Sequence, residues 1–127
     1  MSKLAFFLQK PAGVLCLFIL LGAVTFGEAL TFPFVHDDFF FIVHNPQITE
    51  FNLAEIFAKP TFEKFSPVVN IYFRPIVEIF NRLLFAVFGL SSTGFHAVNI
   101  VVHILNAFCV YLILTRFFDE KGTALFL

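Results

Sequence analysis

Two adjacent carboxylates, Asp37 and Asp38, stand directly behind a long apolar run that ends near Pro33. Charged side chains are costly to bring near lipid, so acids at the exit of a membrane-spanning segment indicate a functional site. Pro33 disfavours helix at the residue before it and marks this exit. We therefore predict a polar site within a few residues of the membrane surface.

A second polar pattern lies in the later apolar run, where His96, Asn99, His103 and Asn106 recur at spacings of three, four and three. This spacing predicts one polar stripe on an apolar helix, and in lipid such a stripe must face another helix or a wet cavity. Hydrogen bonding between helices is the better interpretation for Asn106. For His96 and Asn99, contact with a polar head group is an equally good one.

Arg74 precedes Pro75, which suits the first position of a helix. An arginine at a helix start can hold a phosphate with two hydrogen bonds, helped by backbone N–H groups. An ion pair with Glu78 or with the acidic pair is the alternative. Glu78 and Arg82 form a helical pair that contributes a few tenths of a kcal/mol if exposed, so we assign them a structural role.

A metal site would need several ligands to converge, and the candidates are His36, Asp37, Asp38, His44 and His96. Their spacing matches no zinc pattern, and hard divalent ions follow no fixed spacing. We predict no cofactor, and a divalent metal is the alternative, which the spacing does not support. The sequence also lacks a Gly-rich phosphate loop.

The elements that position these residues belong to a membrane protein. Of 127 residues, 59% are hydrophobic and 13% charged, which is too apolar for one small water-soluble core. The net charge is −1 and the basic residues are scattered, which excludes a nucleic-acid partner. About 20 apolar residues cross a bilayer, and residues 12–33 and 95–118 each suffice. A cleavable signal peptide is the alternative for the first run, disfavoured by its length and the absence of a small-residue cleavage site.

Residues 34–94 are expected to form a long loop with short interfacial helices. A capping box at Asn52 and Glu55 predicts a helix near 53–58. The pattern of residues 75–90 predicts an amphipathic helix lying at the interface, with a crossing helix as the competing interpretation.

Residues 123–127 read as the start of a third span. Basic residues beside the spans place both ends in the cytoplasm and the loop outside it. The predicted fold is thus an all-α, polytopic membrane protein.

Four segments together resemble membrane glycosyltransferases of the GT-C superfamily, and most closely the O-mannosyltransferase-like family with tetratricopeptide repeats. They are Phe34-Val35-His36-Asp37-Asp38, Ile42-Val43-His44-Asn45-Pro46-Gln47-Ile48, Tyr72-Phe73-Arg74-Pro75 and Phe95-His96-Ala97-Val98-Asn99-Ile100-Val101-Val102-His103.

The resemblance implies sugar transfer, with mannose as a candidate, from a polyprenyl-phosphate donor to an acceptor hydroxyl, expected on a protein. It implies that Asp37 is the general base and that Asp38 orients the acceptor or assists. Arg74, His96 and Asn99 would hold the donor phosphate. The membrane would be the bacterial inner membrane or the endoplasmic reticulum, with the active face extracytoplasmic or luminal.

Such enzymes have many more spans, so we expect this chain to be an N-terminal fragment, inactive alone. The alternative hypothesis is a small non-catalytic membrane protein that binds partner helices through its polar stripe.

Overall fold

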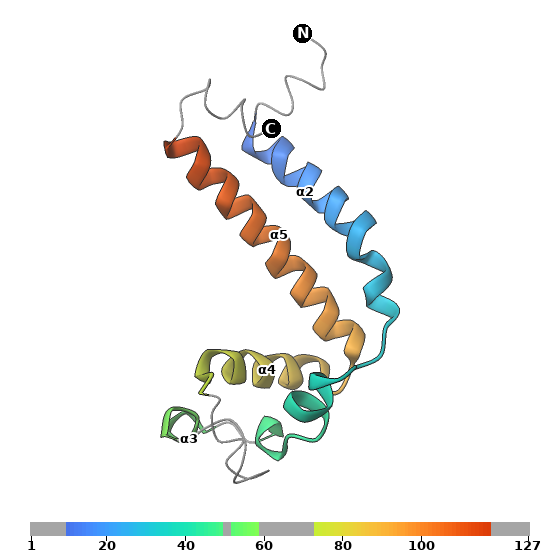
Figure 1. The fold of residues 1–127 in the computed structure, drawn as a ribbon, viewed down its shortest axis with the longest axis vertical. Helices are drawn as coiled ribbons and strands as arrows, with labels where there is room; N and C mark the ends of the chain where they lie inside the picture. The colour runs from blue at the N-terminus through green and yellow to red at the C-terminus, as the bar shows by residue number, and fades with distance from the viewer. Residues whose placement is uncertain (1–9, 50–51, 59–72, 118–127) are drawn as a thin grey trace. The chain divides into compact units, whose positions relative to one another are not determined.

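The computed structural model describes residues 10–49, 52–58 and 73–117, and every regular element in these ranges is a helix (Figure 1). The all-α prediction is confirmed. The predicted start of a third span at 123–127 lies outside the described residues. In chain order the elements are α2 (Pro11–Phe26), the 3-10 helix η1 (Gly27–Thr31), the π-helix η2 (Phe39–Val43), the 3-10 helix η3 (Pro46–Thr49), α3 (Leu53–Ala58), α4 (Pro75–Phe88) and α5 (Ser92–Phe117).

The chain divides into two compact units. The first, here called the span unit, holds α2, η1 and α5 from His96 onward. The second, the loop unit, runs from Phe32 to Phe95 and holds η2, η3, α3 and α4. The predicted catalytic acids belong to the loop unit.

The span unit contains two helical segments long and apolar enough to cross a membrane, Pro11–Thr31 with 21 residues and Ser92–Phe117 with 26. A helix rises about 1.5 Å per residue, so each covers roughly the 30 Å of a hydrocarbon core. Their bounds lie close to the predicted 12–33 and 95–118. Glu28, near the end of the first, is its sole charged residue, and Arg116 is the sole charged residue of the second.

The α2 and α5 helices run antiparallel (Figure 1). Their side chains are in contact. The Phe18 ring meets Tyr111 edge to face at 6.4 Å between centroids. A Cβ built on Gly22 would lie 2.7 Å from Ile104, so glycine permits the close approach. Elsewhere large apolar side chains stay exposed, as lipid-facing surfaces require, among them Leu20, Val24, Val101 and Ile113.

In the loop unit, α4 begins as the sequence predicts, with Pro75 in its first turn after Arg74. It ends at Phe88 and is capped by Gly89, whose φ of 59° suits glycine. Phe88 then packs over Gly94 in the first turn of α5, where a Cβ would lie 2.6 Å from the ring. Through this contact the end of α4 is fastened to the start of α5.

The two faces of α4 are inverted relative to a helix on a water-soluble protein. Glu78 and Arg82 are buried, at 6% and 5% exposure. Ile76 and Val87 on the opposite side are 71% and 73% exposed. The Glu78–Arg82 pair is therefore not the exposed pair that would contribute only a few tenths of a kcal/mol, because the segment that contains Asn45 and Ile48 packs beside it.

Candidate functional site

The turn that carries the two acids is closed by Asp38. Its Oδ2 accepts a hydrogen bond from the backbone N–H of Val35 at 3.0 Å, and its own N–H donates to the Val35 carbonyl at 3.0 Å. Asp37 has an exposed side chain, and within the described residues no hydrogen bond or ion pair involves its carboxylate. The structure thus distinguishes two acids that the sequence only shows as neighbours: Asp38 holds the turn, and Asp37 is accessible.

His36 has a left-handed backbone, with φ at 45°, immediately before the acids. A non-glycine residue in this region carries strain, and such residues cluster at functional sites. Nothing in the local sequence predicts this conformation, although histidine adopts it more often than most residues.

The acids lead into η2, a single π-helical turn. The N–H of His44 donates to the Phe39 carbonyl at 2.7 Å, which is the five-residue spacing of a π-helix. His44 also places Nδ1 3.0 Å from the same carbonyl, and its ring stacks on the Phe39 ring. Because a carbonyl only accepts, we assign the proton to Nδ1. His44 therefore has a structural role in ending the turn, and π turns of this kind are frequent at functional sites.

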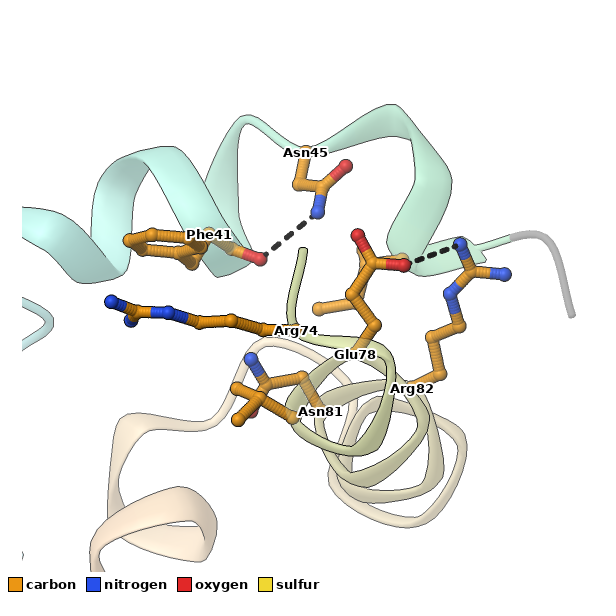
Figure 2. Close-up of a pocket in the computed structure, with 8 residues that line it drawn as sticks. Phe41, Asn45, Arg74, Glu78, Asn81 and Arg82 are labelled. Carbon is orange, nitrogen blue, oxygen red and sulfur yellow. Dashed lines mark hydrogen bonds and ion pairs between the residues drawn. The ribbon is translucent and has the colours of Figure 1, made fainter. Parts of the chain in front are cut away.

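Asn45 lies in the acid-bearing segment, residues 37–49, and faces α4. It is 7% exposed, and its Nδ2 donates to the Phe41 carbonyl at 3.2 Å. Figure 2 shows its amide facing the polar side of α4, with the Glu78 carboxylate pointing toward it. Between them lies a cavity of about 10 Å³, room for about one water molecule. It is lined by Phe41, Asn45, Ile48, Arg74, Val77, Glu78, Asn81 and Arg82.

The buried charges of this cluster are Glu78 and Arg82, whose Oε2 and guanidinium nitrogen lie 3.7 Å apart (Figure 2). The distance is that of an ion pair rather than a hydrogen bond. Arg74 lines the same cavity and extends alongside Phe41 in Figure 2. The structure therefore brings Arg74 into the same unit as Asp37 and Asp38.

The other two predicted site residues lie in the span unit. His96 and Asn99 share an open hollow of about 290 Å³ with Phe26, Ala29, Ile100 and His103. The His103 ring meets Phe26 edge to face at 5.2 Å. Three of the four residues of the predicted stripe, His96, Asn99 and His103, thus line one mostly apolar hollow, and Asn106 is not among its lining residues.

For metal binding, the ranges 10–49, 52–58 and 73–117 contain no group of three or more His, Cys, Asp or Glu side chains able to hold an ion. His36 and His44 lie on the same segment as the acids, and His44 is already engaged with Phe39. No residue set in these ranges is assigned to a metal.

The sequence analysis did not single out Asn45, and it gave Glu78 and Arg82 a structural role without predicting their burial. A side chain's burial depends on which distant segment packs over it. The Asn45 bond also requires the π turn, for which no local pattern was apparent. An Asn-Pro pair, as at 45–46, favours a turn and carries no information on burial.

The chain is similar to the mouse protein named Protein O-mannosyl-transferase TMTC1, with 33% identity over 100 residues. The match covers 75% of this chain and 10% of the mouse protein, so the chain spans about a tenth of that relative. No family model and no solved structure matches. The similarity supports a distant relation to an O-mannosyltransferase, whereas the wider superfamily assignment stays a prediction.

Proposed function

We propose that this chain is the membrane-inserted, acid-bearing part of a glycosyltransferase that moves a sugar, with mannose as the first candidate, from a polyprenyl-phosphate donor to an acceptor hydroxyl on a protein. The observation that carries the proposal is the similarity to an O-mannosyltransferase over three quarters of the chain. The two apolar helices fit such a donor, because its lipid is held in a membrane.

Asp37 is the proposed general base. Its carboxylate takes the proton of the acceptor hydroxyl as that oxygen bonds to the anomeric carbon, and the bond from that carbon to the donor phosphate oxygen breaks. The exposure of Asp37 supports this role, as does the strained residue before it. Asp38 is proposed to orient the acceptor or to assist Asp37, and its hydrogen bond to the Val35 N–H closes the turn that carries both acids.

Arg74, His96 and Asn99 are proposed to bind the donor phosphate, which gains charge as it leaves. Arg74 stands at the N-terminal end of α4, where backbone N–H groups favour an anion. His96 and Asn99 offer polar groups at a hollow among apolar walls. The active face would be extracytoplasmic or luminal.

The test uses a longer polypeptide that contains this segment, in membranes, with polyprenyl-phosphate mannose and a hydroxyl-bearing peptide. Asp37→Asn should lower transfer by about 100-fold or more, because general-base catalysis contributes roughly that much. The control is Glu28→Gln, a change at an exposed carboxylate in the span unit, which should leave transfer unaltered. Full activity of Asp37→Asn at wild-type protein levels would refute the base assignment.

A second candidate is binding of a partner helix through the polar stripe. It is favoured by the exposure of Asn99, His103 and Asn106 on an otherwise apolar helix, because polar groups in lipid seek partners. Loss of a crosslinked helical partner on Asn106→Leu, with no transferase activity in any form of the protein, would support this candidate over the first.

A further inference from the structure

An exposed aromatic ring stands one helical turn from the proposed base. The backbone is helical from Asp37 through Val43, and Asp38 has right-handed helical angles. Residues three apart on such a turn project on the same side, so Asp37 and Phe40 share one face. Both are exposed, Phe40 to 60%. An acid and an aromatic ring therefore lie together on the open side of the acid-bearing segment.

The rest of the same turn is engaged in the fold. Asp38 is half-buried and closes its turn through a hydrogen bond, and Ile42, four residues on, is 6% exposed. The Phe39 ring stacks on His44. For Phe40, the part of the chain that the structure describes supplies no ring contact to its side chain. Its ring is thus available to a ligand, whereas that of Phe39 already has a partner.

The proposed reaction brings the sugar within reach of this ring. The acceptor oxygen must lie about 3 Å from the Asp37 carboxylate to lose its proton, and about 3 Å from the anomeric carbon that it attacks. The anomeric carbon is then within about 6 Å of the carboxylate. The Cβ atoms of residues three apart on a helical turn are themselves about 5–6 Å apart. A sugar positioned for transfer by Asp37 therefore lies at a distance where the Phe40 ring can cover one of its faces.

A hexose matches a phenyl ring in size and in charge. One face of a pyranose ring carries C–H bonds whose hydrogens bear partial positive charge, and the face of an aromatic ring is negative. Stacking the two also removes apolar area from water. A hydroxyl-bearing side chain of the acceptor offers a far smaller apolar area to the ring. The sugar is therefore the favoured occupant.

We propose that Phe40 is a sugar-binding residue whose ring stacks on the C–H face of the transferred hexose while Asp37 deprotonates the acceptor. The inference rests on the proposed transferase function and adds a subsite for the sugar itself, separate from the residues proposed for the donor phosphate. A contact of this kind is made both before and during transfer. It therefore lowers the KM for the donor and leaves kcat nearly unchanged.

The kinetic test uses the longer polypeptide in membranes, with polyprenyl-phosphate mannose and a hydroxyl-bearing peptide. Phe40→Leu should raise the KM for the donor roughly tenfold, the factor that corresponds to losing one aromatic contact. The kcat and the KM for the peptide should not change, and Phe40→Tyr, which keeps the ring, should retain the wild-type KM. The matched control is Phe39→Leu, because Phe39 is an exposed phenylalanine of the same turn whose ring stacks on His44. This control should leave the KM for the donor unaltered.

Two kinetic results would overturn the proposal. A rise confined to the KM for the peptide would place the ring on the acceptor. An unchanged KM for both substrates in Phe40→Leu, in a protein where Asp37→Asn abolishes transfer, would refute the sugar subsite and leave the transferase proposal standing.

A binding measurement separates this inference from the transferase proposal in the other direction. The chain has no tryptophan, so Phe40→Trp in the 127-residue chain, in detergent micelles, gives a single emission that reports a ligand at position 40. Mannosyl phosphate should change this emission saturably, whereas inorganic phosphate should not, and neither ligand should affect Phe39→Trp. A saturable change without transfer in any form of the protein would refute the transferase and keep the sugar subsite. Absence of a change in a variant that circular dichroism shows to be helical would overturn the subsite.

Discussion

Removing one partner of the buried Glu78–Arg82 pair should destabilise the loop unit strongly, whereas replacing both should not. The perturbation is Arg82→Met alone, Glu78→Met alone, and the two together. Methionine is flexible enough to fill the space without adding charge.

The magnitude follows from the geometry. At the observed 3.7 Å and an effective dielectric constant of about 20, two unit charges attract by roughly 4.5 kcal/mol. Both side chains are less than a tenth exposed, so screening by solvent is small. Either single change leaves one charge buried without this attraction and should cost about 3–5 kcal/mol, and the double change should cost about 1 kcal/mol because no isolated charge remains.

The assay is hydrogen exchange of the α4 amides in detergent micelles, which reports the free energy of local opening. A loss of about 3 kcal/mol speeds exchange by roughly 100-fold. The two single variants and the double variant form a double-mutant cycle, which gives the coupling energy between Glu78 and Arg82. Additive single effects, with the double variant as unstable as their sum, would refute the buried pair.

Two further comparisons test the packing and the turn. Gly94→Ala should lower the stability of the loop unit by about 1–3 kcal/mol, because the new Cβ would meet the Cβ and Cγ of Phe88 at 2.6–2.8 Å. Gly22→Ala should lower the unfolding temperature less than Gly94→Ala does, because its new Cβ would meet the mobile end of the Ile104 side chain. Equal losses of stability in the two variants would contradict the Phe88 packing. His36→Gly should match or exceed wild-type stability, whereas His36→Val should lose about 1–2 kcal/mol, and the same values for both would show that the left-handed backbone is absent.

Local signals were enough to place several elements. Asn52 caps α3 through its Oδ1, which accepts from the Glu55 N–H at 3.2 Å, and the helix spans Leu53–Ala58 where 53–58 was predicted. Pro75 begins α4, which ends at Phe88, two residues before the predicted end. Such signals act between residues a few positions apart, so they survive whatever the rest of the chain does.

The candidate site was only partly open to the same reasoning. Asp37 and Arg74 stand out because charge near a membrane is costly. That argument does not predict which residues surround Asp37 or Arg74 in the folded chain. The role of Asp38 in closing its turn depends on backbone conformation at His36, which the residue type permits but does not require.

By itself the sequence determined the two apolar spans, since a bilayer demands about 20 predominantly apolar residues and full internal hydrogen bonding of the backbone. It also determined the amphipathic period of α4. Only the tertiary structure decided which face of α4 turns inward. That choice depends on Asn45 and its segment, some thirty residues earlier, packing over Glu78 and Arg82. Periodicity divides a helix into two faces, but the burial of either face is a property of its partner.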